Sequence, residues 1–559
     1  MSFGGNLSYW KFLTIDNARS AGQFNFSGAN TGLGLADFLT GQSTEFLDSA
    51  PGVLDMKQWY LGVYAQDTWR TTARLTLNAG LRWEPFFGQN INNGAIANFS
   101  LANLQQGIKT TKYVNAPPGL TYPGDPGFPS GNSGMNTQWR NFSPRVGLAW
   151  DVNGNGRTAV RSSYGISYDF PTAQYLYVEA SASPFSNRLD ITGNIPFEDP
   201  YRNVPGGNTL PLPAVPPRDA AFPGLGTYGG MDPNINSPRV QSWNATVERQ
   251  LGSQWQVAAS YLGSYADRLW GQNHLNPGVF LGTGPCSLGG VSYPVCTTTS
   301  NVESRRVFIL QNPAVGQYYG AVVQYTDVGT QAYRGLKLSM RRRSADGISL
   351  NANYTLSNCT TDTEVSGGFA QFTGGYTNPS SVAYDRGNCG SNRRQIATAT
   401  VGARTPTFTN AALRTVASDW RVSGIFNARS GSWLVITTTA DPAGVGVAGQ
   451  RPDQVLDDPY GNKSLDNWLN PKAFAAPAPG TFGNTMRNSV EGPGYWTVDL
   501  ALSRLIARDS MELRLEVFNV TNNFNWGNPS TSINSSTFGR VQTQTGDPRI
   551  LQFGIKYAF

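Results

Sequence analysis

The sequence lacks any long apolar run. Its 559 residues are 39% hydrophobic and its mean hydropathy is −0.33. A helix that crosses a bilayer needs roughly twenty consecutive apolar residues, and no stretch of the chain approaches that length. The sequence therefore excludes a helical membrane protein.

Charged residues, cysteine and histidine are also scarce. Only 14% of the residues are charged, and the net charge of +6 comes from scattered lysines and arginines. The one tight basic cluster, Arg341–Arg343, falls at a predicted turn, so we expect no nucleic-acid binding. The four cysteines form no C-x-x-C motif, and with a single histidine in the chain we expect no zinc site.

The motifs that would carry catalysis or cofactor binding are weak. His274 is the only candidate base, and its neighbours predict an exposed loop. Gly444–Gly449 fits G-x-G-x-x-G, but the Gln-Arg-Pro that follows does not begin a helix. Asp453, Asp457 and Asp458 lack the spacing of a calcium loop. We therefore expect no enzyme activity, cofactor or metal.

Glycine, proline and aromatic residues are abundant. The chain has 63 glycines and 35 prolines, and 12% of its residues are aromatic. This composition favours short strands joined by turns and long polar loops over packed helices. It predicts an all-β protein.

The last eleven residues, Arg549–Phe559, read as a strand with one apolar face. Leu551, Phe553, Ile555 and Tyr557 alternate with small or polar residues up to the final Phe559. A tilted strand of about 9–11 residues crosses a bilayer, and aromatic residues lie at the membrane interface. The segment resembles the signal that the outer-membrane barrel assembly machinery recognises, with Phe553, Ile555, Tyr557 and Phe559 as its residues. A soluble edge strand is the alternative.

Alternation of this kind recurs along the chain. In 74–84, for example, Leu75, Leu77, Leu81 and Trp83 oppose polar residues that include Arg82. We expect about fourteen strands, at 7–14, 59–70, 74–84, 146–151, 157–169, 240–251, 255–265, 333–342, 348–357, 395–404, 420–429, 495–505, 511–520 and 549–559.

The faces opposite the apolar residues carry charge, and short turns alternate with long loops. A dry core would leave such charges desolvated, whereas a wet lumen tolerates them. The pattern predicts a transmembrane antiparallel β-barrel with short turns at one end and long loops at the other. The candidates for lumen-facing residues are Arg82, Glu84, Arg161, Lys337, Arg514 and Glu516.

Several segments together resemble one family, the TonB-dependent transporters of the Oar-like branch. The matching segments are Tyr64–Trp69, Leu75–Glu84, Trp468–Phe474, Gly483-Asn484, Arg487-Asn488, Gly492–Gly494 with Asp499, Glu516–Asn522 and Pro548–Phe559. They occur in family order. One family motif that usually ends in histidine, beginning here at Asp385, ends in Gln395 instead.

The resemblance implies a barrel of twenty-two strands, preceded by a signal peptide, often a carboxypeptidase-regulatory-like domain, a TonB box and a plug. None of these preceding parts is visible in the sequence. We therefore interpret 1–559 as the C-terminal portion of such a barrel, with short periplasmic turns and long extracellular loops. We expect an open curved sheet or a barrel smaller than the family's.

The implied function is outer-membrane transport of an unidentified ligand, with energy from TonB acting through the plug. The implied location is the outer membrane of a Gram-negative cell. The implied partners are outer-membrane lipid, the barrel assembly machinery, TonB and an extracellular ligand. Two alternatives stay open: a structural or adhesive barrel that binds partners through its loops, and a soluble secreted domain that binds polysaccharide.

The four cysteines lie in loop-like sequence. Two disulfides, Cys286 with Cys296 and Cys359 with Cys389, are the expected use in an oxidising compartment, and other pairings stay open.

Overall fold

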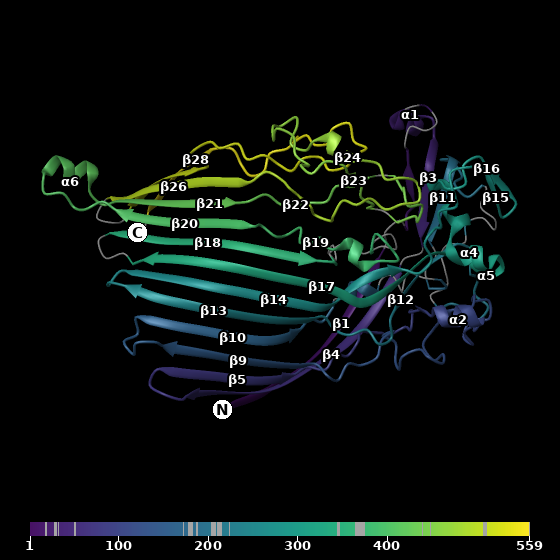
Figure 1. Ribbon diagram of the computed structural model, residues 1–559, viewed down its shortest axis with the longest axis horizontal. Coiled ribbons are helices and arrows are strands. Elements are labelled where there is room, and N and C mark those ends of the chain that lie inside the picture. The colour runs from purple at the N-terminus through teal and green to yellow at the C-terminus, as the bar shows by residue number, and fades with distance from the viewer. Residues whose placement is uncertain are drawn as a thin grey trace.

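The computed structural model consists mainly of strands (Figure 1). It describes residues 1–16, 20–26, 31, 33–49, 52–171, 173–176, 183–185, 188–202, 208, 215–222, 224–343, 347–363, 375–438, 440–447, 449–506 and 511–557.

One 17-stranded sheet dominates the structure. Three of its members are short or lateral: β6 (Asn90–Ile91), β12 (Gly226–Met231) and β19 (Gly387–Asn388). The other fourteen, each antiparallel to its neighbour, are β1 (Ser2–Asp16), β4 (Gly52–Arg70), β5 (Leu75–Trp83), β9 (Phe142–Asp151), β10 (Thr158–Tyr168), β13 (Arg239–Leu251), β14 (Trp255–His274), β17 (Tyr319–Arg342), β18 (Ile348–Thr361), β20 (Gln395–Arg404), β21 (Trp420–Arg429), β26 (Tyr495–Ile506), β27 (Met511–Phe518) and β28 (Ile550–Tyr557). They correspond one to one with the predicted strands.

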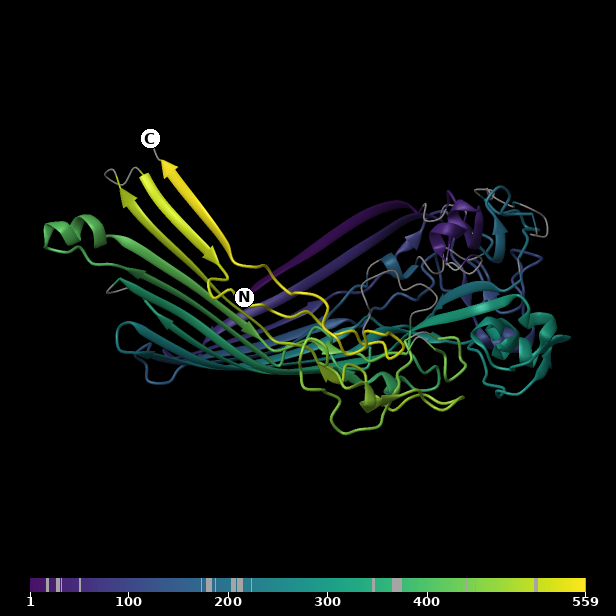
Figure 2. The same cartoon turned by 90° about the horizontal axis from the view of Figure 1, so that it is seen from above.

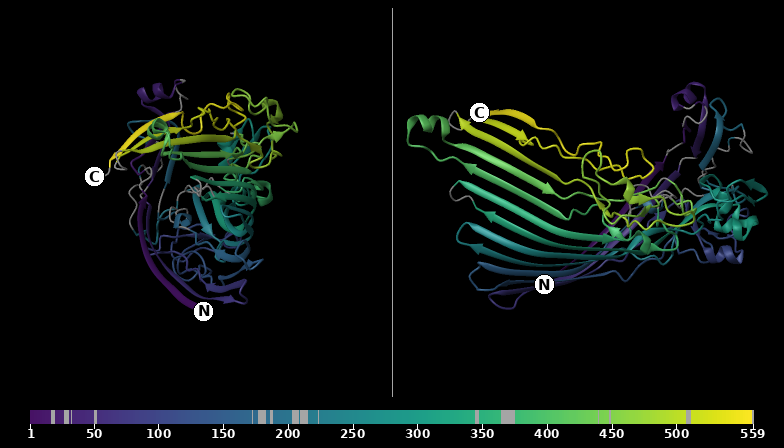
Figure 3. Two further views of the ribbon diagram at one scale, coloured as in Figure 1. Left: turned by 90° about the vertical axis from the view of Figure 1, so that its left-hand side faces the viewer. Right: turned by 45° about the horizontal axis from the view of Figure 1, so that its top comes forward.

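The sheet is bent into an open trough (Figures 2 and 3). Within the described residues, β28 pairs only with β27, and the other edge strand, β1, pairs only with β4. The N-terminal and C-terminal strands therefore form the two edges, as expected for an open curved sheet.

One face of the sheet, here called the apolar face, carries the alternating hydrophobic residues. Leu338 of β17 lies between Ala259 and Tyr354 in register, and it is 45% exposed. Phe553 of β28 is 77% exposed. Large apolar side chains left uncovered in a continuous band are typical of a lipid-facing surface. No second layer of described residues covers these faces, which agrees with the predicted transmembrane barrel.

The opposite face, here called the polar face, lines the inside of the trough. Met56 of β4 lies on the same face as Tyr60 and Tyr64, because successive residues of a strand alternate. Met56 packs in one buried cluster with Trp270 of β14 and Tyr325 of β17. Since four strands separate β4 from β14 in the sheet, these side chains meet only across the concave side.

The two ends of the trough differ in their connections. At the turn end, most strands are joined by short turns. The exception is 405–419, which contains the helix α6 (Ala411–Ala417) and departs from the predicted regularity. At the loop end lie the connections 17–51, 84–141, 169–238, 275–318, 362–394, 430–494 and 519–549.

The described parts of these long connections form what we call the head. Its elements are β2 (Gln23–Asn25), α1 (Gly34–Leu39), β3 (Gln42–Ser49), β7 (Asn98–Phe99), α2 (Leu101–Gln106), β8 (Leu120–Thr121), η1 (Ala173–Leu176), β11 (Arg188–Pro196), β15 (Cys286–Leu288), β16 (Val291–Tyr293), η2 (Thr299–Arg305), α4 (Val307–Gln311), α5 (Pro313–Gly316), η3 (Val382–Asp385), β22 (Trp433–Leu434), β23 (Asp453–Gln454), η4 (Pro471–Ala473), β24 (Phe474–Ala475) and β25 (Val490–Glu491). No described helix has both the length and the apolar character needed to cross a membrane.

The head has buried hydrophobic cores of its own. One includes Phe99, Tyr122, Tyr228 and Tyr319, which come from the connections 84–141 and 169–238 and from β17. β14 and β17 extend into this region beyond their predicted ends, pairing as far as His274 with Val323. The long loops are thus packed structure, because aromatic side chains from distant segments bury one another.

Candidate ligand-binding surfaces

The charged candidates on the polar face form local pairs. Near the loop end of β5, Arg82 forms an ion pair with Glu84, and its Nη2 donates to the Tyr60 hydroxyl at 2.5 Å. The Tyr60 hydroxyl in turn donates to Glu84 Oε1 at 3.0 Å. This network gives the Arg82 guanidinium and the Glu84 carboxylate hydrogen-bond partners within the wall of the trough.

The other four candidates lie on strands farther along the sheet. Arg161 of β10 is 3.5 Å from Glu248 of β13, and Arg514 of β27 is 2.6 Å from Glu516. Lys337 of β17 lies in register between Ser260 and Thr355. The structure therefore does not gather the six residues into one site.

Uncharged polar side chains connect the strands between these charged residues. Ser339 donates to Asn353 Oδ1 at 2.9 Å, and Thr246 donates to Ser260 Oγ at 2.9 Å. Because hydroxyls and amides bind water well, this face suits a hydrated passage. A role for the six charged residues in a substrate path stays a prediction.

The proposed assembly signal lies on the edge strand. Phe553, Ile555 and Tyr557 occupy the apolar face of β28 and are strongly exposed. Phe559 lies outside the described residues.

Two buried arginines hold the head together, and neither was singled out from the sequence. Arg451 Nη1 lies 2.7 Å from Asp385 Oδ1, and both side chains are almost fully buried. Arg451 also donates to the carbonyls of Thr485 and Tyr384, and its guanidinium lies 3.8 Å above the Tyr384 ring. The Asp385 motif was visible in the sequence, but its partner is 66 residues away.

Arg305 is the second of these buried arginines. Its guanidinium donates to Asn301 Oδ1 and to the carbonyls of Val279, Gly444 and Thr298. It thereby binds the Gly-rich segment at 444 to η2. The segment forms a loop, as the sequence predicted, and no helix follows it among the described residues.

Both disulfides join the cysteines that are nearest in sequence. Cys286 and Cys296 close the hairpin of β15 and β16, and Cys359 of β18 is bonded to Cys389. They secure two parts of the head.

The prediction that His274 lies in an exposed loop is wrong. It ends β14 and is only 8% exposed. Burial, with a smaller effect of the nearby Arg306 charge, lowers its pKa to about 4. Pairing of β14 with β17 carries the residue inside the head, which local sequence did not reveal.

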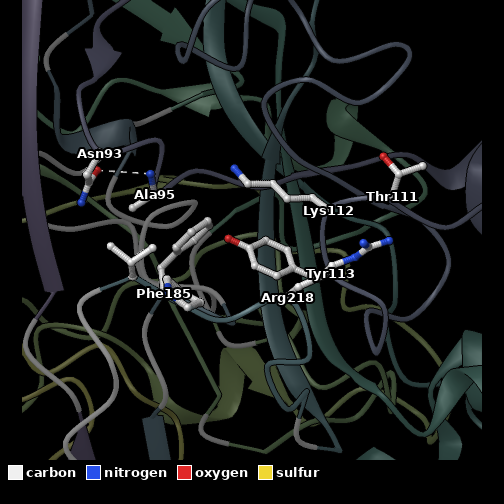
Figure 4. A pocket seen from close by; sticks show the side chains of 9 residues that line it. Asn93, Ala95, Thr111, Lys112, Tyr113, Phe185 and Arg218 are labelled. Atoms are coloured by element: carbon white, nitrogen blue, oxygen red, sulfur yellow. Dashed lines mark hydrogen bonds between the residues drawn. The ribbon is translucent and has the colours of Figure 1, made fainter.

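A cavity of about 470 Å³ opens in the head between the connections 84–141 and 169–238. In Figure 4 the Lys112 ammonium and the Tyr113 hydroxyl point toward the side where Asn93 and Phe185 lie, while Arg218 points away. The described lining residues are Asn93, Ala95, Thr111, Lys112, Tyr113, Phe185, Val215, Pro216 and Arg218.

The cavity combines positive charge with aromatic surface. Desolvation lowers the pKa of Lys112, an effect that Asp125 partly opposes, and burial raises the pKa of Tyr113. No acidic residue is among the described lining residues. The arrangement favours a ligand with an anionic group beside a ring or an apolar part.

The described residues hold no cluster of three or more metal-ligating side chains. Asp453 accepts a hydrogen bond from the Asn484 backbone and Asp458 accepts one from Tyr460, so both serve loop structure.

Solved structures of transporters and receptors are similar to this chain. The outer membrane transporter YddB from Escherichia coli matches with a TM-score of 0.48 and 10% identity, covering 100% of this chain and 51% of YddB. The FrpB iron transporter from Neisseria meningitidis matches with a TM-score of 0.40 and 12% identity, covering 99% and 52%. The ferripyoverdine receptor of the outer membrane of Pseudomonas aeruginosa matches with a TM-score of 0.40 and 13% identity, covering 91% and 40%.

The chain thus spans about half the length, or less, of the solved structures it matches. No curated protein matches the sequence. The family model described as "Outer membrane beta barrel domain" matches residues 1–552, nearly the whole chain. Together with the exposed apolar face and the polar trough, this match shows that the chain is an outer-membrane protein and belongs to the outer membrane beta-barrel domain family.

Proposed function

We propose that this chain is the barrel portion of a TonB-dependent transporter that moves an extracellular ligand across the outer membrane. The observation that carries the proposal is the polar face, where ion pairs and hydroxyl-to-amide hydrogen bonds line the part of the trough nearer its turn end. The sequence motifs that resemble the Oar-like branch support it.

In this proposal the loop end faces the outside of the cell and the turn end faces the periplasm. The head makes the first contact with the ligand, and the cavity beside Lys112 and Tyr113 is our candidate for that contact. The charged pairs on the polar face then hydrate the passage or contact a plug. The chain catalyses no covalent step.

The test is binding of TonB to the complete protein. The complete reading frame is expressed, purified from outer membranes in mild detergent and titrated with the purified periplasmic domain of TonB. We expect saturable binding, because in the resembling family TonB supplies the energy for transport.

A folded, outer-membrane-located complete protein that fails to bind TonB would contradict transport. That result would favour the structural or adhesive barrel. The soluble polysaccharide-binding alternative is excluded, because the chain belongs to the outer membrane beta-barrel domain family.

A further inference from the structure

Two sets of aromatic side chains mark the limits of the apolar face. On β4, Trp59 and Trp69 are ten residues apart and both are about half exposed. Ten residues span about 33 Å along a strand, or about 25 Å across the membrane at the usual tilt of roughly 40°. That distance equals the height of the apolar band of an outer-membrane barrel.

Neighbouring strands supply matching residues on the same face. Those at the turn end are Trp69, Trp150, Trp255 and Trp420, and those at the loop end are Tyr9, Trp59, Trp83 and Phe142. Aromatic residues of this kind lie at the level of the lipid headgroups.

Two lysines lie directly beyond the loop-end aromatic residues. Lys11 of β1 is opposite Lys57 of β4 in register, one step past the Tyr9–Trp59 pair, whose rings are 4.6 Å apart. Like charges directly opposite each other destabilise a sheet unless an anion compensates them. In the described part of the chain neither lysine forms an ion pair. Asp55, two residues before Lys57 on the same face, accepts a hydrogen bond from Asn92 and forms no ion pair among the described residues.

A pocket of about 340 Å³ begins at Lys57 and runs down the apolar face. Its lower wall, toward the turn end of the sheet, is apolar, and its upper wall, toward the loop end, is polar. The described lining residues are Leu7, Trp59, Leu61 and Phe87 below, with Lys57, Gln58, Gly88, Asn90, Ser130, Ser133 and Thr137 above, and none of them is acidic.

Hydrogen bonds fix the upper wall of this pocket. Gln58 Nε2 donates to the Phe87 carbonyl at 2.7 Å and holds the connection 84–141 against β4. Asn90 Oδ1 accepts a hydrogen bond from the backbone N–H of Asn132 at 3.0 Å. The pocket is therefore formed before any ligand enters.

We propose that this pocket binds a phosphate-bearing glycolipid of the outer membrane. The lipid phosphate lies at Lys57 in the mouth of the pocket, with Lys11 opposite it on β1, the sugar contacts the exposed Ser130 and Thr137, and an acyl chain lies along Trp59 and Leu61. Charge complementarity selects the phosphate, and the position of the lysines at headgroup level selects a membrane lipid. That the lipid comes from the outer leaflet rests on the proposed function, which sets the loop end outside.

The test is native mass spectrometry of the full chain with added lipid. The wild-type protein is titrated with diphosphoryl lipid A, with the same lipid after removal of its phosphates, and with inorganic phosphate. The variants are the double Lys11→Gln, Lys57→Gln; the charge-preserving Lys57→Arg; and, as a matched control, Lys472→Gln at an exposed lysine elsewhere in the head. Heat-modifiable migration in electrophoresis checks that each variant is folded.

We expect wild type, Lys57→Arg and Lys472→Gln to bind diphosphoryl lipid A alike. The double variant should bind about thirtyfold more weakly, as the loss of two interfacial charges implies. Equal binding by the double variant, equal binding of dephosphorylated lipid A, or binding of inorganic phosphate as tight as that of the lipid would each overturn the proposal. Because the readout needs neither TonB nor a plug, its failure is distinguishable from failure of the proposed function.

Discussion

The sheet and the head are stabilised by different kinds of contact. In the sheet each long strand pairs with the next long strand along the chain, and its side chains alternate between lipid and the trough. In the head, contacts join distant segments, such as Arg305 with the Gly444 carbonyl 139 residues away. A lipid-facing sheet needs no second layer because lipid covers its apolar face, whereas a structure in water must build its own core.

The largest expected effect is the loss of head stability when the Arg451–Asp385 ion pair is broken, while the sheet stays unchanged. Arg451→Met leaves Asp385 buried without its partner, which costs about 3–5 kcal/mol in the stability of the head. Hydrogen exchange of head amides should accelerate strongly, while amides of β17 and β18 keep their protection. The paired change Arg451→Met with Asp385→Leu should recover much of the loss. Uniform acceleration throughout the sheet would contradict independent stabilisation.

The next largest effect is a difference in the free energy of unfolding between substitutions on the two faces of β17. Leu338→Arg places a charge in the lipid-facing band and is expected to destabilise the protein by about 2–4 kcal/mol. The neighbouring Ser339→Arg points into the trough and should change the free energy of unfolding far less. Urea unfolding in lipid vesicles measures both. Equal losses would mean that the two faces meet the same environment.

The sheet was predictable because its signal is local. Alternation with a period of two located fourteen strands, and their faces followed from the residues themselves. The ends of β14 and β17 were missed because the extension around Gln272 and Tyr325 depends on packing inside the head. The same reason explains why His274 was placed in a surface loop. The partners of Arg451 and Arg305, and the cavity at Lys112, arise from segments whose meeting no local pattern encodes.

Acid should weaken the head before it affects the sheet. Because burial lowers the pKa of His274 from 6.5 to about 4, the unfolded chain takes up a proton that the folded chain does not. Stability is therefore constant above about pH 6.5 and falls as the pH drops toward 4, by about 3 kcal/mol in total. His274→Gln should lose this dependence, as urea unfolding followed between pH 7 and pH 4 will show. If the free energy of unfolding of the variant fell with pH as steeply as that of the wild type, His274 would not be the source of the pH dependence.

The smallest expected effect is the loss of the Cys286–Cys296 disulfide. A closed loop of this length contributes about 2–3 kcal/mol by restricting the unfolded chain. The double variant Cys286→Ser, Cys296→Ser should become sensitive to protease at 275–318 while its sheet keeps its heat-modifiable migration. New cleavage sites within the sheet would indicate that the head and the sheet unfold together.

The most direct test of the account is the water accessibility of two adjacent residues. Single cysteines replace Lys337 or Leu338 in the full chain, whose four native cysteines are all in disulfides, and the protein is reconstituted in vesicles. A water-soluble maleimide should label the Lys337→Cys variant rapidly and the Leu338→Cys variant very slowly. Equal labelling, or faster labelling at 338, would contradict a sheet with lipid on one face and water on the other.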